Sequence, residues 1–274
     1  MGQSVKRRRW AAGVVGAVGL AVLALLVWRA AHPVEDAAWA RIQAEGRLVI
    51  ATDASYEPFA ATDANGDLFG FDIDLADALA RRWGVTAVFE NITYDALLGT
   101  LIVGRDDAVI SAFVAQPERT REVSYTAPYF TGGTLIVIRR EGGAAVTGEP
   151  EAWAAGKTLA VEYGAGGDAL VRQWARRVVG VTVQPLATAG EALAAVSAGT
   201  ADAAVVDAIA AYRFLAEHPE LMSTGPVLEP QPYVIAVSVD SPVLLAQLQD
   251  ALAAMEADGS LGDLRAKWLG EAAR

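Results

Sequence analysis

The 274-residue chain contains no cysteine and only two histidines, His32 and His218. The lack of cysteine excludes disulfide bonds, thiolate metal sites, a cysteine nucleophile and a lipid-bearing cysteine. Two histidines argue against a histidine-built metal site and against a serine-type catalytic triad. We therefore expect no metal, no cofactor and no catalytic residues.

Basic residues are also scarce, with 22 Lys and Arg against 33 Asp and Glu. Residues 1–32 hold five of the basic residues and no acidic one, which leaves 17 against 33, a formal charge of −16, for residues 33–274. Phosphate backbones repel so acidic a body, and nucleic acid is not an expected partner. Disorder is excluded, because a chain that is 53% hydrophobic can bury a substantial core.

The first 32 residues have the pattern of a membrane anchor. Trp10 to Trp28 carries no charge, and as a helix it would nearly span the ~30 Å hydrocarbon core. The basic cluster Lys6–Arg9 should stay in the cytoplasm and send the remainder outside. A cleaved signal peptide and a buried soluble helix are the alternatives; Arg29 stands against cleavage after Ala31, since cleavage sites favour small residues. With either anchor or signal, the body is extracytoplasmic.

After a short linker and helix at 33–45, the sequence alternates between strand and helix patterns. Strands are expected at 48–51, 85–89, 108–110, 134–138, 158–161, 181–183, 203–206 and 233–239, and helices at 71–83, 94–101, 170–178, 188–199, after 206, at 242–257 and at 260–268. Such alternation favours parallel sheets covered by helices on both faces. Two blocks joined by Thr134–Arg140 and Tyr233–Val239 predict two lobes with a ligand crevice at the strand ends.

Four segments, in one collinear order, carry a resemblance to a known family. They are Ala51–Phe59 with Gly66–Leu75, Gln116–Arg119 with Val123–Phe130, Gly199–Asp207, and Asp258–Leu261 with Lys267–Gly270. Together they resemble the family 3 extracellular solute-binding proteins, the amino-acid receptors of ABC importers.

The resemblance implies an α/β, two-lobed periplasmic-binding-protein fold of type II, here with an N-terminal transmembrane helix. Lobe 1 would comprise 46–138 and 232–274, and lobe 2 would comprise 141–229. The cleft between them would close on a free amino acid by hinge motion.

The resemblance also assigns roles to single residues. Arg119 would bind the ligand carboxylate with its planar guanidinium, and Asp207 would receive the ammonium group. Tyr56 and Tyr94 would cover the ligand side chain, and Asp53 would contact a polar or cationic side chain. Other interpretations remain open: a surface arginine, a helix N-cap for Asp207, core tyrosines, and a turn residue for Asp53.

Two stretches depart from the family pattern. Many relatives have a hydroxyl residue two positions after a Gly or Ser, where this chain has Ala112-Phe113-Val114. The usual Gly-Thr-Thr of lobe 2 is Gly164-Ala165-Gly166. Ala112, Val114 and Gly166 are expected to contact the ligand. We expect the Val114 N–H and the N–H groups at the start of the lobe 2 helix to hold the carboxylate with Arg119, and each lost hydroxyl to cost ~1 kcal/mol.

The expected function is a membrane-anchored receptor that delivers a polar amino acid to an ABC permease, without enzymatic activity. A cationic side chain is favoured, because Asp53, and Glu162 if it reaches the pocket, would face it. One alternative is a ligand-sensing domain for a partner receptor. The other is an enzyme resembling cyclohexadienyl dehydratase, with cleft carboxylates as acid and base.

Overall fold

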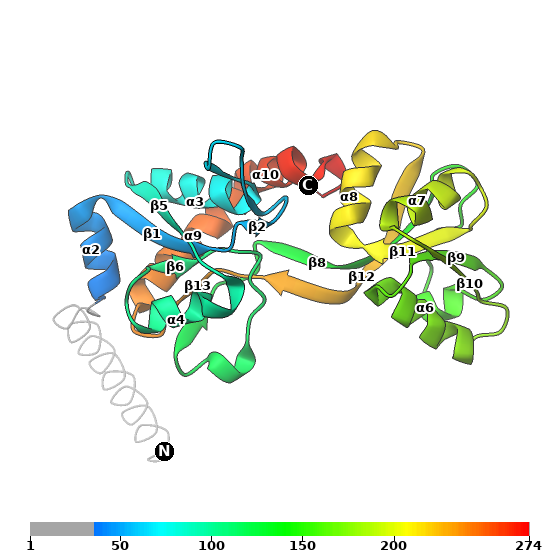
Figure 1. Ribbon diagram of the computed structural model, residues 1–274, viewed down its shortest axis with the longest axis horizontal. Coiled ribbons are helices and arrows are strands. Elements are labelled where there is room, and N and C mark those ends of the chain that lie inside the picture. Colours follow the sequence, from blue (N-terminus) through cyan, green and yellow to red (C-terminus); the bar gives the residue numbers. More distant parts are fainter. Residues whose placement is uncertain (1–35, 274) are drawn as a thin grey trace, which may run out of the picture.

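The computed structural model describes residues 36–273, which form two α/β lobes joined by two long strands (Figure 1). The expected two-lobed fold is therefore confirmed. The predicted membrane segment and residues 33–35 of the predicted linker lie outside the described residues, and the remainder of that linker is largely a helix, Ala37–Glu45. Within 36–273, no helix is both long enough and apolar enough to cross a membrane.

The first lobe is built on a five-stranded sheet in the order β5-β1-β6-β13-β7. Its strands are β1 (Arg47–Thr52), β5 (Thr86–Asn91), β6 (Ala108–Val109), β7 (Val123–Tyr125) and β13 (Ala236–Ser238). β5 and β6 flank β1 in parallel, whereas β13 runs antiparallel to both of its neighbours. A small sheet of β2 (Ser55–Tyr56), β3 (Ala60–Thr62) and β4 (Leu68–Phe69) adjoins it.

Helices cover both faces of this sheet. They are α2 (Ala37–Glu45), α3 (Phe71–Arg82), α4 (Leu97–Ile102), α9 (Pro242–Ala257) and α10 (Ser260–Leu269), with the 3₁₀ turns η1 (Tyr94–Ala96), η2 (Pro117–Arg119) and η3 (Glu271–Ala273). In α3 the apolar residues Phe71, Leu75 and Leu79 share one buried face, and acidic residues fill the first turn and basic ones the last. That charge order complements the helix dipole and supports the helix where its sequence pattern predicts it.

The second lobe has the sheet order β10-β9-β11-β8-β12. Its elements are β8 (Phe130–Arg139), β9 (Thr158–Glu162), β10 (Thr182–Leu186), β11 (Ala203–Asp207), β12 (Leu221–Tyr233), α5 (Pro150–Trp153), α6 (Gly166–Arg177), α7 (Ala189–Ser197) and α8 (Ala208–Glu217). Alternate residues of β8 enter opposite cores: Leu135 and Val137 pack with α7 and α8, and Ile136 and Ile138 pack with α6. A strand buried on both faces explains the continuous apolar run.

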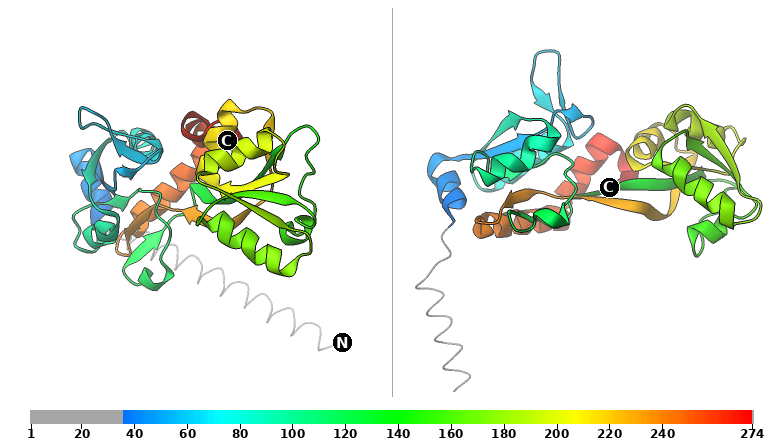
Figure 2. Two further views of the ribbon diagram at one scale, coloured as in Figure 1. Left: turned by 45° about the vertical axis from the view of Figure 1, so that its right-hand side comes forward. Right: turned by 60° about the horizontal axis from the view of Figure 1, so that its bottom comes forward.

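Two antiparallel strands, β8 and β12, run side by side between the lobes, as the right-hand view of Figure 2 shows. One predicted linking segment, Thr134–Arg140, coincides with the second half of β8 except for its last residue, but the other, Tyr233–Val239, is wrong. The linking strand is Leu221–Tyr233, and β13 belongs to the first sheet. The sequence of β12 resembles a loop because it contains Pro226, Pro230 and Pro232. The strand tolerates these prolines because it lies at the edge of the sheet and its register with β8 shifts.

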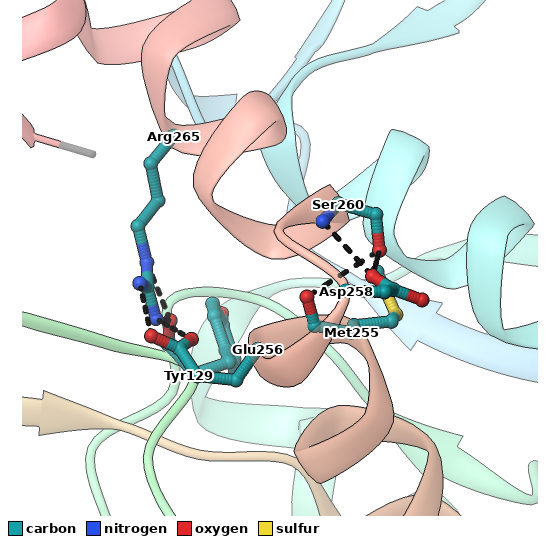
Figure 3. Close-up of polar contacts among 6 residues, drawn as sticks. All are labelled: Tyr129, Met255, Glu256, Asp258, Ser260 and Arg265. Atoms are coloured by element: carbon teal, nitrogen blue, oxygen red, sulfur yellow. Dashed lines mark hydrogen bonds and ion pairs between the residues drawn. The ribbon is translucent and has the colours of Figure 1, made fainter.

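The C-terminal helices hold the start of β8 in place. Arg265 on α10 donates to the Tyr129 carbonyl through Nε (3.3 Å) and Nη2 (2.8 Å), and its Nη2 lies 3.0 Å from the Glu256 carboxylate on α9 (Figure 3). Beside this cluster, the Asp258 carboxylate accepts bonds from the Ser260 hydroxyl (2.6 Å) and N–H (3.0 Å) at the start of α10. The linking strand is thus anchored to the first lobe through Tyr129, the residue that precedes it.

Candidate ligand-binding site

A cavity of about 340 Å³ opens where three parallel strands of the first lobe end. Asp53 follows β1, Tyr94 follows β5, and Ser111 follows β6. The full lining is Asp53, Ser55, Tyr56, Tyr94, Ser111, Ala112, Val114, Gln231 and Tyr233. Carboxyl ends of parallel strands are where α/β folds bind ligands. Five residues named from the sequence meet here: Asp53, Tyr56, Tyr94, Ala112 and Val114.

Asp53 organises the loops around the cavity. Its Oδ1 accepts the N–H of Ser55 at 3.0 Å, and its Oδ2 accepts the N–H of Tyr94 at 2.7 Å. Its own N–H donates to the Ser111 hydroxyl at 2.9 Å. The turn-forming role, one of the two interpretations of this residue, is present, and Asp53 also lines the cavity.

Two tyrosine rings form an exposed aromatic wall. Tyr56 is 43% exposed and stacks on Phe59, with ring centroids 5.5 Å apart; Tyr94 is 38% exposed and stacks on Phe113 at 5.3 Å. Both phenylalanines are buried and support the rings from behind. Neither tyrosine belongs to the core. An exposed, well-supported ring can cover apolar methylenes or the underside of a cation.

Tyr233, at the end of β12, was not among the residues singled out from the sequence. It is 5% exposed, and its hydroxyl lies 3.5 Å from that of Tyr56. Burial first, then Tyr56 and the charge of Asp207, raise the pKa of its phenol far above the usual range. It therefore stays neutral and can donate a hydrogen bond. Its only sequence signal was a place at the start of an expected strand.

Ala112 is fixed in a left-handed conformation, with a φ of 44°. Its N–H donates to Asp72 Oδ2 at 2.6 Å and to the Tyr129 hydroxyl at 3.0 Å. Because this N–H already has two acceptors within the protein, it is not free to bind a ligand. The left-handed region favours glycine, so the Ala in place of the family's Gly or Ser has a backbone cost. The neighbouring Val114 N–H donates to the Tyr94 hydroxyl at 3.4 Å.

Three of the residues named from the sequence do not line this cavity. Arg119, in η2, pairs with Glu122 at 2.8 Å, and its side chain is 45% exposed. Asp207 and Gly166 belong to the second lobe, at the start of α8 and α6. Asp207 Oδ1 accepts the N–H groups of Ile209 (2.9 Å) and Ala210 (3.1 Å), so the N-cap interpretation is present. The charge of Asp207 nevertheless reaches Tyr233 at the cavity.

Among residues 36–273, no group of three or more His, Asp or Glu side chains is arranged to hold a metal ion.

Comparison with known proteins finds relatives that are similar in sequence and in structure. The chain is 30% identical over 227 residues to ABC transporter arginine-binding protein 1 of Escherichia coli, covering 81% of this chain and 90% of that protein. An ancestral cationic amino acid solute-binding protein has 29% identity and a TM-score of 0.61, covering 84% of this chain and 98% of that one.

The fold itself is shared more widely. The L-cystine solute receptor of Neisseria gonorrhoeae, in its unliganded open conformation, is 23% identical with a TM-score of 0.73 over 86% of this chain and 97% of that one. The family model described as bacterial extracellular solute-binding proteins, family 3, matches residues 48–271. The chain therefore belongs to the family 3 bacterial extracellular solute-binding proteins.

Proposed function

We propose that this protein is an extracytoplasmic receptor that binds a polar, basic amino acid between its lobes and delivers it to an ABC permease. The observation that carries the proposal is the cavity at the ends of β1, β5 and β6, with its exposed tyrosine wall and its polar Ser55 and Ser111. A free amino acid fits a site with an aromatic surface and a few polar groups.

In the proposed complex, Arg119 and Asp207 hold the two charges that all amino acids share. Arg119 exchanges its exposed partner Glu122 for the ligand carboxylate, to which the guanidinium can donate two parallel bonds. Backbone N–H groups at the start of α6 add donors for the same anion. Asp207 receives the ammonium group with Oδ2, because Oδ1 already caps α8.

The preference for a basic side chain rests on charge and on the relatives. Asp53 gives the cavity a negative wall, and the tyrosine faces favour a cation. Two of the matched proteins are described as binding arginine and cationic amino acids. Transfer to an ABC permease is inferred in the same way from the matched arginine-binding protein. A tether through residues 10–28 completes the proposal.

A thermal-shift screen of the full-length chain against the twenty amino acids tests the proposal. A ligand present at 100 times its dissociation constant should stabilise the protein by ~2.7 kcal/mol. We expect the largest shift from arginine or lysine. The proposal fails if no amino acid shifts the transition, or if cyclic precursors of aromatic amino acids are turned over, which would favour the enzyme alternative.

A further inference from the structure

Near the candidate site, but outside the lining of its cavity, lies a carboxylate that the sequence did not point to, Glu229 in β12. Both oxygens of Asp53 already accept backbone N–H groups, at 3.0 Å from Ser55 and 2.7 Å from Tyr94. In residues 36–273, by contrast, Glu229 makes no side-chain hydrogen bond or ion pair, and it is exposed. A carboxylate that has no hydrogen-bond partner in the protein is stabilised more by a ligand cation than one that already accepts two backbone N–H groups.

An irregular stretch of β12 directs this side chain. Leu228 pairs with Thr134 and Gln231 with Gly132, so Glu229 and Pro230 together stand opposite Gly133. Glu229 has a φ of 45°, which a non-glycine residue rarely adopts. Bulges of this kind re-aim side chains beside functional sites.

The Glu229 carboxylate lies on the second lobe's side of the cleft. A Cβ placed on Gly166, the first residue of α6, would lie 3.9 Å from Glu229 Oε2 and 3.9 Å from Thr134 Oγ1. Thr134 is paired with Asp207 across β8 and β11. Two residues further along β12, Gln231 lines the tyrosine-walled cavity. The Glu229 carboxylate is therefore close to the start of α6 and to Thr134, the strand neighbour of Asp207, and it is two residues along β12 from the cavity lining.

We propose that Glu229 is the specificity-determining residue that recognises the cationic side chain of the ligand. This inference rests on the proposed function, and it names the residue that gives the receptor its preference for a basic amino acid. Among the proposed site residues and Glu229, Arg119 is the one cation against the three carboxylates of Asp53, Asp207 and Glu229. A neutral amino acid satisfies Arg119 and Asp207 and leaves Glu229 to be desolvated without a partner as the lobes close, which is costly. A guanidinium or ammonium side chain removes that cost.

The test is a comparison of arginine with citrulline, which has the same shape and no side-chain charge. Calorimetric titrations of the full-length chain should give a wild-type preference for arginine of at least about tenfold, or ~1.4 kcal/mol. In Glu229→Gln the preference should fall below about threefold, chiefly by loss of arginine affinity. Glu229→Asp, which keeps the charge, should retain most of it, and Glu217→Gln, an exposed charge on α8, should leave it unchanged.

Two outcomes would overturn the inference while leaving the receptor function intact. One is an unchanged arginine-to-citrulline ratio in Glu229→Gln. The other is an equal gain in affinity for both ligands, which would mean that Glu229 competes with the ligand carboxylate at the start of α6. Absence of binding by either ligand to the wild-type protein, with no shift from any amino acid, would instead refute the proposed function.

Discussion

The Tyr129 hydroxyl donates a hydrogen bond of 2.7 Å to Asp72 Oδ1, and both groups are fully enclosed beneath the candidate site. The other oxygen of Asp72 accepts the N–H of Ala112 at 2.6 Å. One buried carboxyl group thus fixes both the left-handed backbone at Ala112 and the residue that precedes β8. The site and the linking strand share a single polar support.

This support should make stability depend on pH. Burial raises the pKa of Asp72 to about 7, from roughly 3.9 in an unfolded chain. Between these values the folded state keeps a proton that the unfolded state has lost, so the stabilisation is full below pH ~4 and is lost as the pH rises through ~7. The total loss is roughly 4 kcal/mol. Urea unfolding from pH 4.5 to 7.5 should show the wild type losing stability relative to Asp72→Asn; parallel curves would refute the shift.

Substitutions at Ala112 should separate backbone strain from side-chain packing. Ala112→Gly should raise the free energy of unfolding by about 1 kcal/mol, because glycine removes the left-handed strain at φ 44°. Ala112→Val should lower it by at least ~2 kcal/mol, because the site is buried and the conformation excludes β-branched residues. Ala115→Gly, at a position without positive φ, is the control and should not stabilise. Thermal denaturation of the three variants and the wild type measures these stability changes, and an Ala112→Gly variant no more stable than the wild type would contradict the strain at Ala112.

Arg119 should dominate affinity. In Arg119→Ala the ligand carboxylate would face the closing cleft without its counter-charge, at a cost of ~2–5 kcal/mol, or roughly 30- to several-thousand-fold in affinity. The fold should be unaffected, because the side chain is exposed and, among residues 36–273, pairs with the similarly exposed Glu122 alone. Arg121→Ala, an exposed neighbour, is the matched control and should bind normally. Equal ligand affinities of the two variants, measured by calorimetry, would show that Arg119 does not bind the ligand.

The membrane tether is tested on residues outside the described part of the chain. Expressed in a bacterium, the full chain should stay with the membranes through a carbonate wash, and its intact mass should begin at Met1 or Gly2. The physical reason is the uncharged run from Trp10 to Trp28, followed directly by Arg29. A soluble product that begins near His32 would show signal cleavage instead.

The sequence predicted those parts of the fold that have a strong hydrophobic period. The strand at 48–51, the helix at 71–83 and the two C-terminal helices all lie within two residues of β1, α3, α9 and α10. β12 escaped prediction because its prolines and Gly225 mimic a loop, and its pairing with β8 is a long-range contact. The segment at 94–101 starts as a 3₁₀ turn rather than an α-helix, and its first N–H, that of Tyr94, donates to Asp53, which is far away in sequence.

The candidate site was predicted from the sequence only in part. Five residues named from the sequence line one cavity from three separate loops, whereas Arg119, Asp207 and Gly166 do not line it. Tyr233 and Glu229 carry no motif; burial distinguishes the first, and a bulge in an unpredicted strand distinguishes the second. Neither burial nor register can be derived from local sequence.

The most direct measurement is a calorimetric titration of the full-length protein with arginine, lysine, glutamine, leucine and glutamate. Tightest binding of arginine or lysine, with glutamine weaker and glutamate weakest, is the predicted result, because cleft carboxylates attract a cationic side chain and repel an acidic one. Tightest binding of glutamate or leucine would contradict the charge argument, and no binding of any of the five would contradict the account of a receptor for basic amino acids.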